Sequence, residues 1–220
     1  MVSDKLEIKN RYESEAFTYL TKRKVYFSYV GTRMINVVNF AIKLASKTSD
    51  LKLLDVGSGS GFFERSIRDI KSNVKIWVSL DIAENVIRMQ KDLSPGIDIM
   101  VADAEHPPFR DNVFDIVIIS RSIKFVDPEK ALGESRRVSK KFFILFADVA
   151  DTLWAQIMEQ LIGINVDPAA WNNFRTPFSR KIETFLQLFF IIKAKVHVTA
   201  MPLSLFNRSP SFLVKKNSRF

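Results

Sequence analysis

Three glycines on alternate positions mark the stretch of the chain that points most directly to chemistry, LLDVGSGSGFFERS (53–66). Gly57, Gly59 and Gly61 follow an apolar run and precede an amphipathic one. Glycine reaches positive φ at low cost and lets a ligand approach the bare backbone. Asp55 stands two residues before the first glycine, where its charge is unfavourable beside a phosphate and suits a cation. The stretch therefore predicts a ligand-binding loop.

Two common phosphate-binding motifs do not fit this loop. A dinucleotide fold uses Gly-x-Gly-x-x-Gly, and here the third glycine of that pattern is replaced by Phe62. A P-loop would continue with Gly-Lys-Ser/Thr, which does not follow. The chain has no Cys, and its two histidines, His106 and His197, have no ligand-type spacing, so no metal site is expected.

The segments around the loop predict how it is positioned. Apolar runs rich in β-branched residues alternate with helical stretches, which indicates a parallel sheet covered on both faces. The expected strands are 51–56, 74–80, 98–102, 114–120 and 141–149, with helices at 61–71, 84–93 and 128–139. Asp127 before Pro128 is a good helix start. Residues 1–50 have helical periodicity, and two further helices are expected at 151–163 and 178–190. The β-like runs 191–200 and 211–216 are expected to pair antiparallel at the edge of the sheet. The predicted fold is a doubly wound α/β domain with a mostly parallel seven-stranded sheet and a helical N-terminal extension.

Four segments in order resemble the class I S-adenosylmethionine-dependent methyltransferases. They are LLDVGSGSGFF, VSLDIAENVI, VADAEHPPFRDNVFDIVIIS and FVDPEKALGESRRVSKKFFILF, and together they cover about 51–148. The likeness is greatest to the small type 11 branch, which includes quinone-precursor methyltransferases. The resemblance implies a Rossmann-like fold, S-adenosyl-L-methionine as cofactor and S-adenosyl-L-homocysteine as product. It divides a single domain, 1–220, into a helical lid or extension (1–50), a cofactor-binding core (51–149) and an acceptor-side insertion with edge strands (150–220).

The resemblance also implies a role for each residue at a strand end. Asp81 is expected to accept from both ribose hydroxyls, Asp103 from the exocyclic amine of adenine, and Asp55 to neutralise the ammonium directly or through water. The predicted cofactor-binding residues are Asp55, Gly57, Ser58, Gly59, Gly61, Asp81, Ile82, Asp103, Ala104 and Ser120. Each of the three acids has an alternative role as a turn cap, and Ile82 as a core residue.

The residues that would meet the methyl acceptor are less well defined by the sequence. His106 follows Asp103 and is a candidate general base, with a solvent-exposed loop histidine as the alternative. Tyr12 belongs to the predicted lid, where a core role is the alternative. Trp171 and Arg175, in DPAAWNNFRTPFS, are candidates for an apolar acceptor pocket with one cation.

Composition and charge narrow the class of protein. The 220 residues carry a net charge of +9, the first ten residues lack the apolar core of a secretion signal, and no apolar run approaches the ~20 residues of a membrane span. A cytoplasmic protein is therefore expected. Residues 171–220 hold nine Lys/Arg against the single acid Glu183. This basic C-terminal region indicates nucleic acid as one candidate partner.

The leading functional prediction is an S-adenosylmethionine-dependent methyltransferase that acts on a small, aromatic or lipid-like acceptor. One alternative is methylation of RNA or protein, although SRSIKF (120–125) replaces the catalytic Asn/Asp-Pro-Pro-aromatic tetrad after the fourth strand. The other is a non-catalytic cofactor-binding protein. The presence of all three acids, Asp55, Asp81 and Asp103, favours an intact site.

Overall fold

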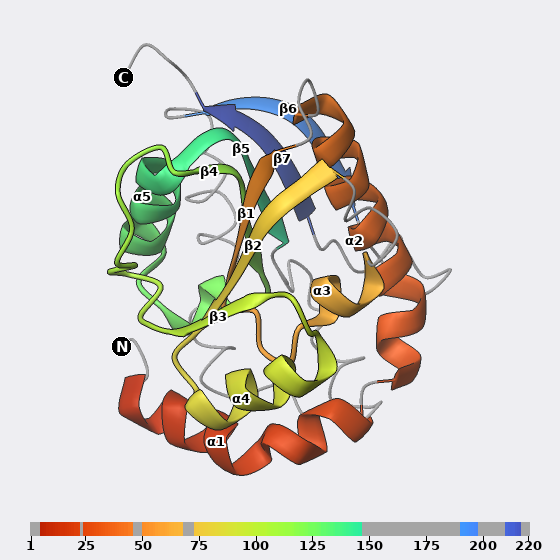
Figure 1. Ribbon diagram of the computed structural model, residues 1–220, viewed down its shortest axis with the longest axis vertical. Helices are drawn as coiled ribbons and strands as arrows, with labels where there is room; N and C mark the ends of the chain where they lie inside the picture. The colour runs from red at the N-terminus through yellow and green to blue at the C-terminus, as the bar shows by residue number, and fades with distance from the viewer. Residues whose placement is uncertain are drawn as a thin grey trace, which may run out of the picture.

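The computed structural model describes residues 5–22, 24–45, 50–67, 73–146, 190–197 and 210–216. Two helices open the chain, and strands then alternate with helices up to residue 146, except that the third strand leads to the fourth without a helix between them (Figure 1). The helices are α1 (Lys5–Lys22), α2 (Lys24–Ala45), α3 (Phe62–Ser66), α4 (Glu84–Leu93) and α5 (Pro128–Val138), with a short 3₁₀ helix η2 (Ile123–Phe125). The strands are β1 (Leu51–Val56), β2 (Val74–Asp81), β3 (Asp98–Val101), β4 (Phe114–Ser120), β5 (Ser139–Phe146), β6 (Phe190–His197) and β7 (Pro210–Lys216).

The strands form one sheet in the order β3-β2-β1-β4-β5-β7-β6. β1 to β5 pair in parallel, and β7 pairs antiparallel with both β5 and β6. From β1 the chain moves outward to β2 and β3, and then returns to place β4 on the other side of β1. Strand order therefore reverses between β1 and β4. Ligands of open α/β sheets bind at such a switch point, outside the carboxyl ends of the strands.

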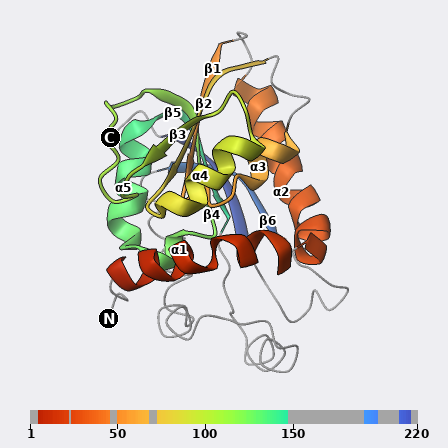
Figure 2. The ribbon, with the colours of Figure 1, turned by 60° about the horizontal axis from the view of Figure 1, so that its bottom comes forward.

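Alternation along the strands builds two apolar cores, one on each face of the sheet. Leu54 and Val56 of β1 pack with side chains of α5, whereas Leu51 and Leu53 pack with side chains of α2 and α3. Figure 2 shows α5 on one side of the sheet, α2 and α3 on the other, and α1 across the ends of the strands. Because both faces are covered, β1 and β4 are buried almost throughout, as expected for central parallel strands.

The start of α5 shows how local sequence fixes an element beside the site. Asp127 accepts hydrogen bonds from the backbone N–H of Glu129 and Lys130, at 3.0 and 3.3 Å, and Pro128 occupies the first turn. A capping carboxylate and a proline without N–H both suit the first turn of a helix. This confirms the predicted helix start and fixes where the loop after β4 ends.

The predicted α/β fold with a parallel sheet is confirmed for the five strands β1 to β5. The predicted helix 84–93 and the strands 51–56 and 114–120 coincide with α4, β1 and β4. β5 begins two residues earlier than predicted, and the predicted helix 128–139 ends one residue earlier, at Val138. The helix predicted at 151–163 lies outside the described residues, and so does the one at 178–190 except for Phe190, which begins β6.

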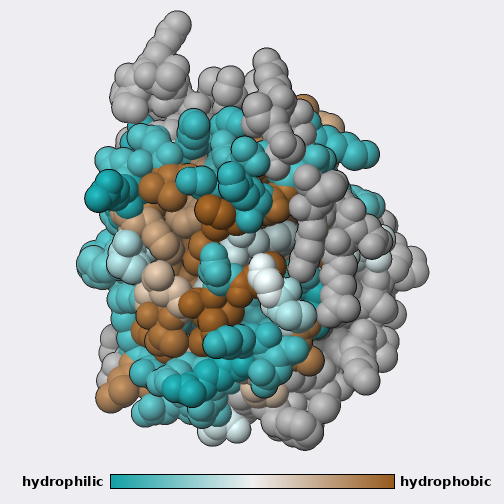
Figure 3. Space-filling model, viewed as in Figure 1, coloured by the Kyte–Doolittle hydropathy of each residue, from teal (hydrophilic) through white to brown (hydrophobic). Residues whose placement is uncertain are grey.

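The surface of the described residues is mixed in character. Apolar side chains gather near the middle of the face seen in Figure 3, surrounded by hydrophilic ones. Among the described helices, none has the length and apolar character that crossing a membrane would require.

Candidate functional site

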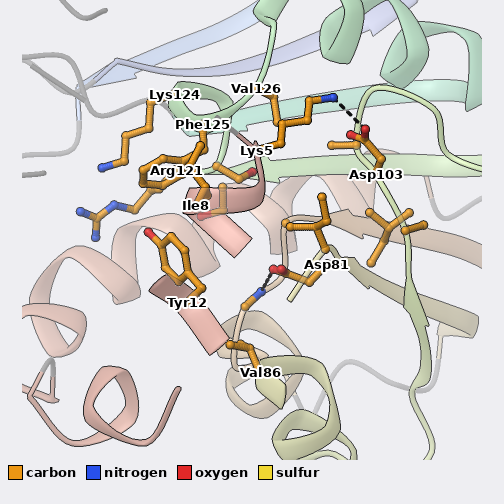
Figure 4. A pocket seen from close by; sticks show the side chains of 18 residues that line it. Lys5, Ile8, Tyr12, Asp81, Val86, Asp103, Arg121, Lys124, Phe125 and Val126 are labelled. Atoms are coloured by element: carbon orange, nitrogen blue, oxygen red, sulfur yellow. Dashed lines mark hydrogen bonds and ion pairs between the residues drawn. The ribbon is translucent and has the colours of Figure 1, made fainter. Parts of the chain in front are cut away.

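A pocket lies at the carboxyl ends of β1, β2 and β4, where strand order reverses, and α1 covers it (Figure 4). It contains about 860 Å³ of empty space, part of it open to solvent. The described residues that line it are Lys5, Ile8, Tyr12, Gly57, Gly59, Leu80, Asp81, Ile82, Val86, Ala102, Asp103, Ala104, Ser120, Arg121, Ser122, Lys124, Phe125 and Val126.

The glycine loop forms the floor of the pocket. Gly57, Gly59 and Gly61 have φ of 70°, 56° and 77°, in the left-handed region that favours glycine. The N–H groups of Gly57 and Ser58 both donate to the carbonyl oxygen of Leu80, at 2.7 and 3.0 Å, so the loop folds over the end of β2. A side chain at position 57 would also overlap Ser122. The loop conformation therefore depends on glycine for two separate reasons.

Asp81 ends β2 and holds the loop to the next helix. One carboxylate oxygen accepts from Gly59 N at 2.8 Å, and the other accepts from Ala83 N at 2.9 Å. Burial raises the pKa of Asp81, and these backbone N–H groups oppose the rise. A carboxylate offers about four acceptor positions. Gly59 N and Ala83 N each use one of these positions, and the N–H of Ile82 also favours the charged carboxylate.

Asp103, after β3, lies in the same pocket and is paired with α1. Lys5 Nζ contacts Asp103 Oδ2 at 2.7 Å and Glu105 Oε2 at 2.8 Å. Burial alone would raise the pKa of Asp103, but the hydrogen bonds from Lys5 and from Glu105 N outweigh it and lower that pKa. Asp103, Glu105 and His106 each offer one atom that could bind a metal ion, and these three atoms lie within 4.8 Å of one another. The positive charge that contacts the two carboxylates is the ammonium of Lys5.

Helix α1 is anchored at a second point. Glu13 accepts from Glu84 N at 2.6 Å and from Asn85 N at 2.7 Å. Helix α4 has Ala83 at its N-cap, which offers no side-chain acceptor, so Glu13 caps α4 from a helix about seventy residues earlier in the chain. Between the two anchors, the Tyr12 ring meets the Phe125 ring edge-on, with centroids 5.4 Å apart. The contacts fix α1 over the pocket.

Two buried carboxyls lie beneath the glycine loop. Asp55 is 1% exposed, and no N–H or O–H group donates to either of its oxygens in the described part of the chain. Its neighbour Glu64 accepts from the Ser79 hydroxyl, which also accepts from Gln90 Nε2 at 2.7 Å. Burial raises the pKa of Asp55 well above its ordinary value, and the charges of Glu64 and Asp81 raise it further. A proton held by either carboxyl, Asp55 or Glu64, relieves their mutual repulsion.

This arrangement predicts that Asp55 makes stability depend on pH. Because its pKa is higher in the folded than in the unfolded state, the folded state binds the proton more tightly, and stability falls as pH rises from the ordinary aspartate value through the folded-state value. We expect Asp55→Asn to raise the free energy of unfolding at pH 8 by about 1 kcal/mol or more, since a buried polar group without a donor costs about 1–3 kcal/mol and more when charged. The gain should vanish near pH 4.

Urea unfolding at several pH values measures this effect. The exposed Asp92, on α4, provides the matched variant Asp92→Asn, which should show no such pH-dependent gain. Equal stability of Asp55→Asn and wild type at pH 8 would show that the buried charge is not costly.

The structure brings together most of the residues that the sequence singled out. Gly57, Gly59, Asp81, Ile82, Asp103, Ala104, Ser120 and Tyr12 all line the pocket. Asp55, Ser58 and Gly61 do not: Asp55 lies under the loop, Ser58 donates to Gln90 Oε1 at 3.0 Å, and Gly61 packs against Gln90. The His106 side chain is 73% exposed and does not line the pocket, which agrees with the alternative reading of a solvent-exposed loop histidine. Trp171 and Arg175 lie outside the described residues.

Several pocket residues were not anticipated from the sequence. Lys5, Ile8 and the loop after β4 with Arg121, Lys124 and Phe125 all contribute side chains. Local patterns gave no signal for Lys5, whose partner is 98 residues away. The position of SRSIKF directly after a strand end was a usable signal for the loop, because such loops surround the switch point.

Comparison with known proteins agrees with this geometry. Residues 54–145 match the family described as "Methyltransferase domain". Demethylmenaquinone methyltransferase of Renibacterium salmoninarum is 38% identical over 90 residues, 40% of this chain and 37% of that protein. Malonyl-[acyl-carrier protein] O-methyltransferase of Geobacter sulfurreducens is 27% identical over 139 residues, 61% of this chain and 49% of that protein. Magnesium protoporphyrin IX methyltransferase from Synechocystis PCC 6803, with bound SAH, has the same fold with a TM-score of 0.67 at 14% identity, covering 98% of this chain and 100% of that one.

Residues 54–145 are thus similar to a methyltransferase family and share the fold of solved methyltransferases that hold SAH or SAM, which supports S-adenosylmethionine as the cofactor. The matched model is that of the type 11 branch, and the match spans residues 54–145. The chain spans about half or less of the length of the curated relatives just named.

Proposed function

We propose that this chain is an S-adenosylmethionine-dependent methyltransferase that acts on a small acceptor with an aromatic or lipid-like body. The observation that carries the proposal is the pair of carboxylates at successive strand ends in one pocket, Asp81 as the last residue of β2 and Asp103 after β3. The Asp81 carboxylate lines the pocket and is proposed to accept from the two ribose hydroxyls. Asp103 accepts from Lys5 and Glu105 N, which leaves positions for an exocyclic amine.

The charges around the glycine loop support a cofactor without phosphates. Asp55, Glu64 and Asp81 lie close enough that each of the other two raises the pKa of Asp55. Such a negative potential opposes a pyrophosphate and favours the ammonium and sulfonium of S-adenosylmethionine. The proposed contribution of the Asp55–Glu64 pair, in which one carboxyl holds a proton, is therefore a single negative charge beneath the loop. The remaining predicted residues, Ile82, Ala104 and Ser120, are proposed to surround the base and the methionine moiety, as members of the pocket wall.

The cofactor supplies an activated methyl group on a positively charged sulfur. In the proposed reaction an electron pair of the acceptor forms the new bond to the methyl carbon while the carbon–sulfur bond breaks, and the sulfur leaves as a neutral thioether. The chain's task is then to position the acceptor and exclude water. Helix α1, anchored by Lys5 and Glu13, closes one side of the pocket and serves the second purpose. Tyr12, on α1, is proposed to face the acceptor.

Calorimetry with three ligands tests the proposal. We expect S-adenosylmethionine and S-adenosylhomocysteine to bind with micromolar dissociation constants, and NAD to give no measurable heat under the same conditions. NAD shares the adenosine but carries a pyrophosphate and a nicotinamide riboside in place of the methionine sulfonium, so the comparison tests the preference for a ligand without phosphates. Tighter binding of NAD than of S-adenosylmethionine would contradict the proposal.

A further inference from the structure

The loop after β4 carries two cations into the pocket at the end opposite the strand-end carboxylates. Arg121 and Lys124 both line the pocket, from a loop that ends with η2. Figure 4 shows the Arg121 guanidinium, the Lys124 ammonium and the Tyr12 hydroxyl on one side of the pocket, with Asp81 and Asp103 on the other. Arg121 and Lys124 thus lie apart from both of these carboxylates.

The backbone holds Arg121 in an unusual conformation. Its φ is 62°, a left-handed value that costs about 1–2 kcal/mol in a residue with a side chain. The conformation is fixed on both sides: Arg121 N donates to the Phe146 carbonyl oxygen at 2.8 Å, and the Ser122 hydroxyl donates to the Val56 carbonyl oxygen at 3.0 Å. A long charged side chain thus occupies a position where glycine would cost less. Strained residues of this kind concentrate at ligand-binding sites.

The surroundings of the two cations are aromatic. Lys124 Nζ lies 4.9 Å from the centroid of the Phe125 ring, which in turn meets the Tyr12 ring edge-on. Among the described residues that line the pocket, the carboxylates are Asp81 and Asp103, both at the other end. The third cation among the described pocket residues, Lys5, lies at that end, paired with Asp103 and Glu105. The cationic end therefore offers positive charge beside flat apolar surface.

We propose that Arg121, with Lys124, forms a subsite for an oxyanion of the methyl acceptor, a carboxylate or a phosphate attached to a flat or apolar body. The proposal rests on the proposed function, because S-adenosylmethionine must occupy the carboxylate end for the acceptor to lie at this one. A guanidinium presents paired N–H donors that match a carboxylate or phosphate. Tyr12 and Phe125 would flank the body of the acceptor. The subsite makes Arg121 a determinant of specificity for acidic acceptors.

Titration of the S-adenosylhomocysteine-saturated protein tests the subsite. The probes are 4-hydroxybenzoate, phenyl phosphate and the neutral methyl 4-hydroxybenzoate, with binding measured by calorimetry. We expect at least one of the two anions to bind at least tenfold more tightly than the ester. Arg121→Gln should reduce that anion's affinity at least tenfold while ester binding and the affinity for S-adenosylhomocysteine stay unchanged. Lys124→Gln should act in the same direction with a smaller effect, and Arg121→Lys should retain part of the affinity.

Arg110→Gln, at an exposed position outside the pocket, is the matched loss of charge and should change none of these values. Equal affinity for anions and ester, or no anion binding, would overturn the subsite while leaving the methyltransferase proposal intact. A loss of S-adenosylhomocysteine affinity in Arg121→Gln with anion binding retained would overturn it too, since Arg121 would then hold the carboxylate of the cofactor. Failure of wild type to bind S-adenosylhomocysteine would overturn both proposals.

Discussion

Asp81→Ala is expected to weaken the binding of S-adenosylhomocysteine at least tenfold while the protein stays folded. Hydrogen bonds that involve a charged group contribute about 1.5–3 kcal/mol, and Asp81 is proposed to make two of them to the ribose. The substitution also releases Gly59 N and Ala83 N, so the loop loses its connection to the start of α4. Burial raises the pKa of Asp81, which means that the folded state itself gains little from this charge. The loss should therefore fall mainly on binding.

Asp81→Asn refines the test, because an amide keeps the shape of the side chain but turns one acceptor into a donor. That N–H would face Gly59 N–H or Ala83 N–H, so a loss comparable to that of alanine is expected. Asp98→Ala, at the exposed start of β3, is the matched control and should bind as wild type does. Calorimetry gives the affinities and thermal unfolding reports the fold. Undiminished affinity in Asp81→Ala would remove Asp81 from the proposed site.

Gly57→Ala is expected to abolish measurable cofactor binding and to destabilise the protein by about 2–5 kcal/mol. A left-handed φ costs about 1–2 kcal/mol for alanine, and overpacking against Ser122 adds about 1–3 kcal/mol. If the backbone shifts to relieve the unfavourable φ or the overlap with Ser122, the glycine loop that forms the floor of the pocket moves with it. Urea unfolding and S-adenosylhomocysteine titration measure the two effects.

Two other glycines and one double variant separate the causes. Gly96 has φ of 84° with open space around it, so Gly96→Ala should lose only about 1–2 kcal/mol. Gly133 lies in α5 with open space, and Gly133→Ala should gain roughly 0.5–1 kcal/mol. Adding Ser122→Gly to Gly57→Ala should recover the overpacking part, measured against Ser122→Gly alone. Wild-type stability of Gly57→Ala would contradict the described loop geometry.

The fold of the core follows closely from local sequence patterns. β1 and β4 are apolar almost throughout because their side chains pack into the cores on both faces of the sheet. The sequence of α4 has the periodicity of a helix with one buried face. Asp127 and Pro128 predict the start of α5, because the capping hydrogen bonds and the proline all lie within four consecutive residues. Such features are predictable because the interactions that produce them lie within one element.

The parts of the site that the sequence did not reveal depend on distant contacts. Asp55 shares a strand face with Leu51 and Leu53, and because β1 is buried on both faces its sequence does not show which face α3 will cover. Glu13 caps a helix 71 residues away, and no local pattern links the two. The conformation of Arg121 likewise comes from its bond to the end of β5. Tertiary contacts, rather than propensity, decide these positions.

The crystal structure of the complex with S-adenosylhomocysteine tests the central claim most directly. The account predicts both ribose hydroxyl oxygens within about 3 Å of the Asp81 carboxylate and the adenine amine within hydrogen-bond distance of Asp103. It also predicts the sulfur beside Gly57 and Ser120, facing Arg121 and Tyr12. A complex in which the nucleoside lies elsewhere, with Asp81 bonded only to Gly59 N and Ala83 N, would contradict it.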